Sequence, residues 1–379
     1  IITETGGKTS HSAILARALE IPAVLSVNGA VSKLSAGAYV IVDGSEGVVI
    51  DEPDDAVIQE YDTKRINFLK ERKELENFRG KATKALSGEE YELFCNIGKP
   101  EDAIKAVDAD GEGVGLFRTE FLFMDRTALP TEDEQFDAYK KAALTLKGKP
   151  VIIRTLDIGG DKEIPYLGLK KEENPFLGFR AIRYCLKHKD LFKTQLRAIV
   201  RASAFGDVRI MFPLITAVEE LREGKALVEE VKAELREQGV EFNENIPVGI
   251  MTETSAAVMI ADILAKESDF FSIGTNDLTG YTMACDRGND DVAYLYSPLQ
   301  PSVLRGIKYI IDCANKNNIS VGMCGEAAAN PMMVPLLMSF GLTEFSVSAP
   351  SVLKVRKTIS AWSKAEADKV AEKVLAMTC

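Results

Sequence analysis

Histidine is scarce in this sequence, and cysteine pairs and long apolar runs are missing from it. His11 and His188 are its only histidines, which excludes a metal site built from several imidazoles. The six cysteines are widely spread and none forms a CxxC pair, so a disulfide framework is not expected. No stretch approaches the roughly 18 uninterrupted apolar residues of a transmembrane helix.

Basic residues are also fewer than acidic residues. The chain has 57 acidic against 46 basic residues, a net charge of −11, which argues against a nucleic acid partner or an anionic membrane surface. The length of 379 residues suggests two or three domains, or one barrel plus a remainder, and the 46% of hydrophobic residues is normal for a globular protein with a substantial core. The chain begins at Ile1 without a signal peptide. We therefore expect a fragment of a longer cytoplasmic protein without membrane insertion.

Three regions differ in pattern. Residues 1–52 combine a helical stretch with short β-like runs, and residues 53–86 are highly charged with a helical rhythm that predicts a linker helix. Residues 87–379 contain near-continuous apolar runs, typical of parallel strands covered on both faces. They predict an α/β fold with a (β/α)₈ TIM barrel. The eight predicted strands are 91–98, 113–118, 151–159, 208–215, 247–254, 269–277, 319–326 and 344–350.

Polar residues gather at the carboxyl ends of these predicted strands, where barrels of this type carry their active sites. Converging arginines suit a phosphate or carboxylate, because the planar guanidinium binds such groups bidentately. Glu253 and Asp277 follow successive strands and could hold Mg²⁺, completed by substrate oxygens and water. The other candidates are Arg118, Arg154, Asp157, Arg180, Asn276, Arg287 and Cys324.

Each candidate also has an ordinary structural explanation. An arginine in a barrel loop is commonly a surface or ion-pairing residue, and a carboxylate after a strand can cap the next helix. Cys324, within an apolar strand, fits a small buried core residue. The occurrence of all of them at one end of successive strands is much harder to explain in this way. The predicted site therefore depends on the whole set.

His11 lies apart from the barrel, at the start of a predicted helix. A lone histidine there is usually structural or solvated, yet glycines and hydroxyl residues surround this one. Backbone N–H groups and the helix dipole favour an anion at this place and disfavour imidazolium, which leaves a neutral, nucleophilic ring. His11 is thus a candidate phosphoryl acceptor, whereas His188, between two lysines, is interpreted as a surface residue.

These residues lie in motifs that resemble those of the phosphoenolpyruvate-utilising enzymes. TGGKTSHSAI at 5–14 is similar to their phosphohistidine motif. DRGN at 286–289 and FSVSAP at 345–350 most resemble the Enzyme I branch, the phosphoenolpyruvate–protein phosphotransferases of bacteria. The resemblance covers essentially the whole chain. Its other barrel motifs are GLFRTEFL at 115–122, RTLDIGGDK at 154–162, NPFLGFR at 174–180, GIMTE at 249–253, GTNDLT at 274–279 and GMCGE at 322–326.

The resemblance implies a role for each matching residue. His11 would be the phosphorylated histidine, and Cys324 would donate the proton to the enolate carbon as pyruvate forms. Glu253 and Asp277 would ligate Mg²⁺, and the barrel would form a homodimer. Arg118 and Arg154 would bind the phosphate of phosphoenolpyruvate. The further substrate contacts implied by the family are Arg180, Asn276, Asp277 and Arg287.

In this family a domain that docks the histidine phosphocarrier protein, and the first part of the phosphohistidine domain, precede the histidine motif. Residues 1–52 are thus predicted to be the C-terminal part of a swivelling phosphohistidine domain, and residues 87–379 the substrate-binding and dimerisation barrel. The linker would let one histidine visit both donor and acceptor.

Three functions from different classes remain open. The first is the phosphotransferase, and the second is a Mg²⁺-dependent dikinase, synthase or lyase on a similar barrel. The third is a non-catalytic module that binds phosphoenolpyruvate and dimerises. A lyase gives no reason for the histidine motif, and a dikinase would need a nucleotide-binding domain upstream.

Overall fold

The computed structural model describes residues 1–379 except 6–15, 17–20, 125, 160–163, 287 and 378–379. The chain divides into two compact units, Ile1–Asn77 and Phe78–Cys379. In the described part of the chain, no helix has both the length and the apolar character needed to cross a bilayer.

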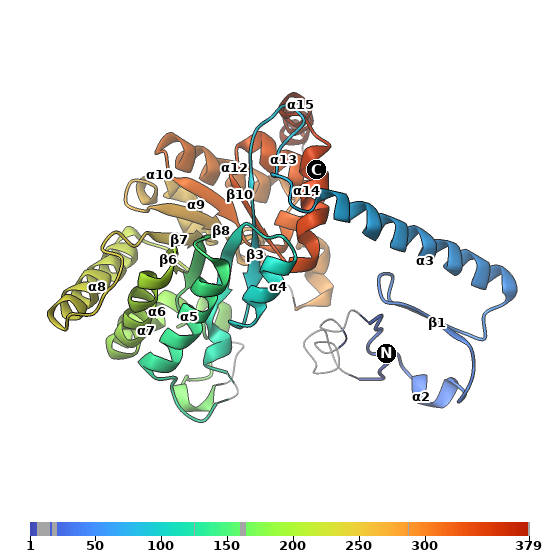
Figure 1. Cartoon of the computed structure of the whole chain (residues 1–379), viewed down its shortest axis with the longest axis horizontal. Helices are drawn as coiled ribbons and strands as arrows, with labels where there is room; N and C mark the ends of the chain where they lie inside the picture. Colours follow the sequence, from blue (N-terminus) through green and yellow to red (C-terminus); the bar gives the residue numbers. More distant parts are fainter. Residues whose placement is uncertain (6–15, 17–20, 125, 160–163, 287, 378–379) are drawn as a thin grey trace. The chain divides into compact units, whose positions relative to one another are not determined.

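The second unit is a closed barrel of parallel strands surrounded by helices (Figure 1). The strands follow the order β10-β3-β4-β5-β6-β7-β8-β9, so each pairs with its neighbours in sequence and the last closes on the first. This confirms the predicted (β/α)₈ barrel. The strands are β3 (Glu92–Ile97), β4 (Gly113–Arg118), β5 (Val151–Arg154), β6 (Val208–Phe212), β7 (Val248–Thr252), β8 (Phe270–Ile273), β9 (Ser320–Met323) and β10 (Glu344–Val347).

These segments form strands of a barrel because they carry apolar side chains on both faces of the sheet. One set of side chains fills the barrel interior, namely Leu116, Ile152, Met211, Met251, Phe270 and Cys324. The alternate residues, such as Phe117 and Ile153, pack outward in the large core beneath the helices. Cover on both faces shields the strands from water, and closure of the barrel leaves none of these strands with an exposed edge.

The helices that cover the barrel follow the strands along the chain. They are α4 (Asp102–Asp108), α5 (Glu132–Leu146), α6 (Ala181–Lys187), α7 (Lys189–Ala202), α8 (Val218–Glu237), α9 (Ser255–Met259), α10 (Ala261–Leu264), α11 (Thr275–Met283), α12 (Pro301–Lys316), α13 (Met333–Phe340), α14 (Val352–Ser360) and α15 (Lys364–Ala376). Helix α5 begins with a capping box between Thr131 and Glu134.

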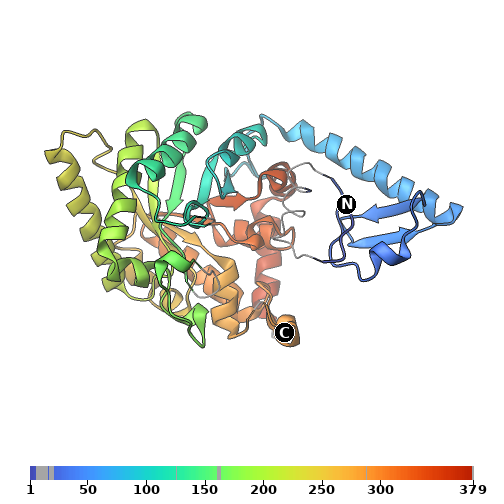
Figure 2. The same cartoon turned by 90° about the horizontal axis from the view of Figure 1, so that it is seen from below.

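The first unit is small, and few of its described residues are buried. Strands β1 (Val40–Asp43) and β2 (Val48–Asp51) form an antiparallel pair, which Figure 2 shows side by side near the short helix α2 (Ala30–Lys33). Helix α3 (Asp55–Leu75) follows, and the side chain of Asp54 caps it by accepting a hydrogen bond from the N–H of Val57 at 2.9 Å. It lies within the predicted linker range 53–86. The functional division of the chain into 1–52, 53–86 and 87–379 stays a prediction.

Candidate active site

Several predicted site residues lie at the carboxyl end of the barrel. Arg118 and Arg154 are the last residues of β4 and β5 and pair directly in the strand register, while Glu253 and Cys324 directly follow β7 and β9. Side chains alternate along a strand, so Arg118, Arg154 and Glu253 continue the rows of Leu116, Ile152 and Met251. The barrel interior therefore ends in a ring of charged groups.

All the predicted strands except 113–118 are longer than the observed ones, and in two of them three candidates lie three or more residues beyond the observed end of the strand. Strand β8 ends at Ile273, and Asn276 and Asp277 lie in the first turn of α11. Strand β5 ends at Arg154, so Asp157 lies in the loop that follows it. The chain leaves the sheet after β8 at Gly274, which precedes α11 and approaches Glu253 closely, and no side chain caps this helix.

Arg154 is a buried arginine held between two carboxylates. Its Nη2 lies 2.8 Å from Glu120 Oε1 and its Nη1 lies 3.0 Å from Asp157 Oδ2. Its Nη1 also faces Met251 Sδ at 3.7 Å. Its Nε is buried and has no hydrogen-bond partner among the described residues, so it is a donor that an anionic ligand can use.

Arg180, just before α6, extends this network. Its Nη2 lies 2.7 Å from Asp157 Oδ1 and 3.2 Å from Asp277 Oδ2, and its Nη1 donates to the hydroxyl of Tyr281 at 3.3 Å. Asp157 thus bridges the two arginines. The result is one chain of ion pairs from the turn after β4 to α11, in the order Glu120, Arg154, Asp157, Arg180 and Asp277.

The electrostatics show an excess of negative charge. Burial lowers the pKa of Arg154, but attraction from Glu120, Asp157 and Glu253 outweighs this and raises it, so the guanidinium stays charged. Burial and then repulsion from Asp277 and Asp157 raise the pKa of Glu253 to about 8, although Arg154 and Arg180 oppose the shift. The site therefore favours additional positive charge near Glu253.

Glu253 is held firmly in place. It is 2% exposed, and its Oε1 accepts a hydrogen bond from the N–H of Leu214 at 2.7 Å. Leu214 has a φ of 57°, in the left-handed region that a non-glycine residue seldom adopts. On the other side, a Cβ added to Gly274 would lie 2.6 Å from Glu253 Oε2. This close approach requires a glycine.

The carboxylates of this site fit a hard cation whose other ligands would be substrate oxygens and water. Among the described residues, no group of three or more His, Cys, Asp or Glu side chains is arranged to hold a metal ion. Glu253 and Asp277 provide two carboxylates in a site with excess negative charge. Mg²⁺ commonly uses one or two protein carboxylates and completes its shell with substrate phosphate and water.

Arg118, Cys324 and Asn276 complete the described part of the site. Arg118 is exposed, with its guanidinium 5.3 Å from the ring centre of Phe121. Cys324 is 6% exposed and its thiol faces the carbonyl of Ile273 at 3.8 Å. Burial raises the pKa of this thiol to about 12, so it is protonated at neutral pH. Asn276 Oδ1 accepts from the N–H of Glu326 at 3.4 Å, which leaves its amide N–H₂ as the available donor.

Two predicted site residues, His11 and Arg287, lie outside the described residues. Asp157, a predicted site residue without an assigned role, links both arginines, and Tyr281 was not among the predicted residues. A signal for Tyr281 exists in its position four residues after Asp277, on the same face of a helix. The sequence does not indicate that Glu120 is the partner of Arg154, because this pairing depends on the register of the two strands.

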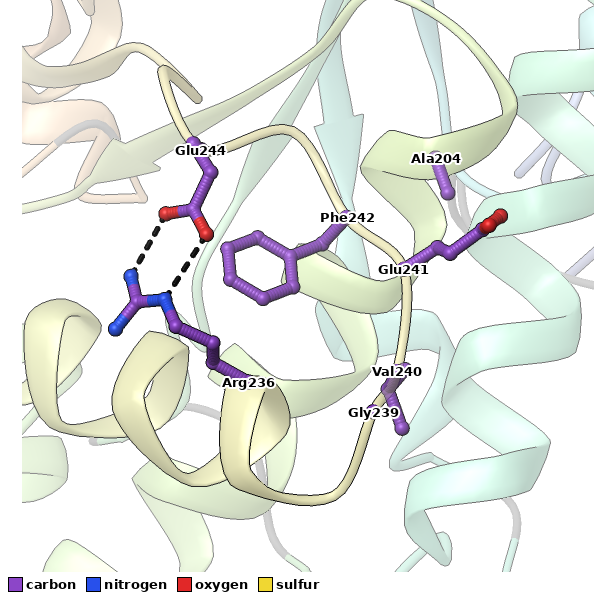
Figure 3. Close-up of a pocket in the computed structure, with 7 residues that line it drawn as sticks. All are labelled: Ala204, Arg236, Gly239, Val240, Glu241, Phe242 and Glu244. Atoms are coloured by element: carbon purple, nitrogen blue, oxygen red, sulfur yellow. Dashed lines mark hydrogen bonds and ion pairs between the residues drawn. The ribbon is translucent and has the colours of Figure 1, made fainter.

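Two cavities lie at opposite ends of the barrel. One of about 250 Å³ opens beside the network and is lined by residues after β5, β6 and β7, together with Tyr281. Another, of about 500 Å³, lies where the chain enters β7 (Figure 3). Phe242 and the Arg236–Glu244 ion pair line this second cavity. Because it lies at the amino ends of the strands, it is separate from the charged site.

Comparison with known proteins identifies the family. Residues 72–363 match the family described as "PEP-utilising enzyme, PEP-binding domain", and residues 1–47 match "PEP-utilising enzyme, mobile domain". The chain belongs to the PEP-utilising enzymes. The charged end of its barrel thus lies in the part that matches the PEP-binding domain of this family, and the motif around His11 lies in the part that matches the mobile domain.

Curated relatives agree with this family assignment. The chain is 49% identical over 376 residues to a phosphoenolpyruvate-protein phosphotransferase of Priestia megaterium, and 50% identical over 376 residues to that of Bacillus subtilis strain 168. Each match covers 99% of this chain and 66% of the relative, so the chain spans just under two thirds of their length. The resemblance of this chain to phosphoenolpyruvate–protein phosphotransferases is thereby confirmed.

A solved structure of a citrate lyase from Burkholderia xenovorans LB400 is a much weaker match. It shares 17% identity, with a TM-score of 0.46 over 75% of this chain and 81% of that one. This similarity is too low to bear on function.

Proposed function

We propose that this PEP-utilising enzyme transfers a phosphoryl group from phosphoenolpyruvate to His11, for onward transfer to the histidine phosphocarrier protein, and releases pyruvate. The observation that carries the proposal is the convergence of three arginines and four carboxylates at the carboxyl end of the barrel, in a chain about 50% identical to phosphoenolpyruvate-protein phosphotransferases. The whole protein would act in the cytoplasm, and the barrel would form a homodimer.

The arginines would bind and orient the phosphoryl group. Arg118 is exposed at the barrel mouth, and Arg154 has a free Nε donor in the described structure, so both can donate to phosphate oxygens. Arg180 would support this arrangement through Asp157. Asn276 can donate its amide N–H₂ to the substrate, and Arg287 would add a further contact. Phosphoryl transfer depends mainly on such positioning and charge neutralisation.

Glu253 and Asp277 would hold Mg²⁺, which when bound would neutralise charge on the phosphoryl and enolate oxygens. His11, as a neutral imidazole, would attack phosphorus in line and break its bond to the enolate oxygen. Cys324 would then give its proton to the enolate carbon, which forms pyruvate. A buried thiol with a pKa of about 12 holds that proton at neutral pH and is therefore a donor there.

Labelling tests the proposed function directly. The chain is incubated with ³²P-phosphoenolpyruvate and Mg²⁺, and acid-labile, base-stable label on histidine is measured. We expect label on the parent chain and on His188→Ala, and none on His11→Ala. Binding without label on any of them would instead support the non-catalytic module that binds phosphoenolpyruvate and dimerises. Label that requires a nucleotide would support a dikinase.

A further inference from the structure

A fully buried glutamine outside the site connects the turns that carry its arginines. Gln195 lies on α7 and is 0% exposed, on a helix face whose neighbouring buried residues, Phe192, Leu196 and Ile199, are apolar. Its Oε1 accepts from the N–H of Leu156 at 2.9 Å, and its Nε2 donates to Thr119 Oγ1 at 3.1 Å. Thr119 lies between Arg118 and Glu120, and Leu156 lies just before Asp157.

Thr119 continues the connection to the second arginine. Its hydroxyl donates to the carbonyl of Arg154 at 2.8 Å. Gln195 therefore holds Thr119, the residue that follows β4, directly. It also holds the end of β5 on both sides of Thr155, through Thr119 at Arg154 and directly at Leu156 in the loop that follows the strand. These two strand ends carry four charged residues of the site, Arg118, Glu120, Arg154 and Asp157.

The direction of each hydrogen bond is determined by the chain of bonds. The hydrogen of Thr119 Oγ1 is used toward Arg154 O, so this oxygen must accept from Gln195. Tyr139 likewise donates to Gln135 Oε1 at 3.2 Å and accepts from Gln195 Nε2 at 3.2 Å. Leu156 N–H needs an acceptor. A side chain at this position must therefore donate to the Thr119 and Tyr139 hydroxyls and accept from the Leu156 N–H. A glutamine amide, with two N–H donors and one carbonyl acceptor, meets all three requirements.

We propose that Gln195 is a positioning residue for phosphoenolpyruvate binding, which it supports by holding the ends of β4 and β5 in register so that Arg118 and Arg154 face one phosphate. The inference rests on the proposed function for the identity of the ligand. The positioning itself is a property of the free chain. Gln195 lies on α7, beneath these strand ends, and it acts through Thr119 and Leu156.

Gln195→Met tests this, because methionine keeps the volume and removes all three hydrogen bonds. Gln135→Met is the matched control, because Gln135 is also buried, at 2% exposed, and accepts a hydrogen bond from Tyr139 in the same network. Its own amide donates to the carbonyl of Pro130, away from both strand ends. Hydrogen exchange of the free chain reports the positioning, and calorimetry with phosphoenolpyruvate and Mg²⁺ reports its effect on binding.

We expect Gln195→Met to accelerate exchange at Leu156 and to weaken phosphoenolpyruvate binding, each by about tenfold, as loss of buried hydrogen bonds predicts. Gln135→Met should change both by less than about twofold. Unchanged exchange at Leu156, unchanged affinity, or equal effects of both variants would overturn the positioning role. A parent chain that binds no phosphoenolpyruvate would reject the proposed function, and exchange at Leu156 alone would then decide whether Gln195 holds the strand ends.

A second variant keeps the test decisive if Gln195→Met does not fold. Thr119→Val preserves shape and removes only the connection from Gln195 to Arg154. We expect a smaller loss of affinity in the same direction, about threefold, with exchange at Leu156 little changed. Full parental affinity in a folded Thr119→Val chain would contradict the proposal.

Discussion

Arg118 and Arg154 hold equivalent positions in neighbouring strands, yet their surroundings differ completely. Arg118 is exposed beside Phe121, whereas Arg154 is 7% exposed and paired with two carboxylates. An exposed cation that binds a ligand contributes little to folding. A buried arginine in an ion network contributes to folding as well as to ligand binding, because its removal leaves buried carboxylates without a partner.

The two arginines should therefore respond differently to substitution. Arg118→Ala is expected to weaken phosphoenolpyruvate binding by about 10- to 100-fold, as for loss of charge-assisted hydrogen bonds, with stability unchanged. Arg154→Met is expected to weaken binding similarly and also to lower the free energy of unfolding by roughly 3 to 5 kcal/mol. Calorimetry and urea denaturation measure the two effects.

Arg236 provides the control for this pair. It is also an arginine in an ion pair, with Glu244, but it lines the cavity at the opposite end of the barrel (Figure 3). Arg236→Ala should leave phosphoenolpyruvate affinity unchanged. If Arg118→Ala behaves in the same way, Arg118 does not bind the phosphate.

Cys324 should be required for turnover and not for binding. Its buried thiol is the proposed proton donor, so Cys324→Ala is expected to keep phosphoenolpyruvate affinity and to slow pyruvate formation by about 100-fold or more, the usual contribution of a general acid. Pyruvate formed in a single turnover is the measurement. Cys313→Ala removes another buried thiol, on α12, and should have no effect. Equal rates in the two variants would remove Cys324 from this role.

At the scale of the elements, the start of α6 depends on one close backbone approach. Gly159 follows β5, and a Cβ added there would lie 2.1 Å from the Cβ of Arg180 and 2.8 Å from its Cα. The loop after β5 therefore packs directly against the residue that joins Asp157 to Asp277. A side chain at position 159 cannot be accommodated without moving Arg180.

Gly159→Ala is expected to displace Arg180 and to weaken phosphoenolpyruvate binding by about tenfold or more. The same substitution should lower stability by roughly 1 to 3 kcal/mol, as overpacking of a tight contact does. Gly306→Ala is the control, because a Cβ on that helical glycine would meet only Val258, at an ordinary 3.5 Å. It should be neutral or slightly stabilising. Parental affinity in Gly159→Ala would mean that the position of Arg180 is not needed for binding.

Elements were easier to predict than their ends. All eight strands were predictable because each is an apolar run covered on both faces, a property of the local sequence. The predicted strand 151–159 was too long because residues 155–159 are also buried, although they form a loop. Burial alone does not distinguish a strand from a buried loop, and this is why Asp157 was placed on the wrong element.

At the scale of the whole molecule, the barrel interior also contains a buried carboxyl group apart from the charged site. Glu344 on β10 is 5% exposed, and its side chain occupies space that glycines leave open, since added Cβ atoms at Gly115 and Gly322 would lie within 3.0 Å of it. Its Oε1 has no hydrogen-bond partner among the described residues. Burial and then repulsion from Glu92 raise its pKa to about 8, against the opposing effect of Arg209.

This raised pKa makes stability depend on pH with a defined sign. Between the ordinary glutamate pKa of about 4.5 and about 8, the folded chain holds a proton that the unfolded chain has lost. Stability should therefore fall as pH rises through this window, by up to about 1.4 kcal/mol per pH unit for one proton. Glu344→Gln should make this slope shallower and should stabilise the chain above pH 8. Identical slopes in urea denaturation between pH 5 and 9 would contradict the prediction.

The sequence by itself determined the parallel barrel, the family and most of the described charged residues at the strand ends. Two-faced apolar runs and short motifs are local, and a closed barrel brings all its strand ends to one place. Tertiary structure alone decided which charges pair, that Asp157 joins Arg154 to Arg180, and that Gln195 connects both strand ends. Those choices depend on register, burial and distance between segments far apart in the chain, which residue types and spacing do not encode.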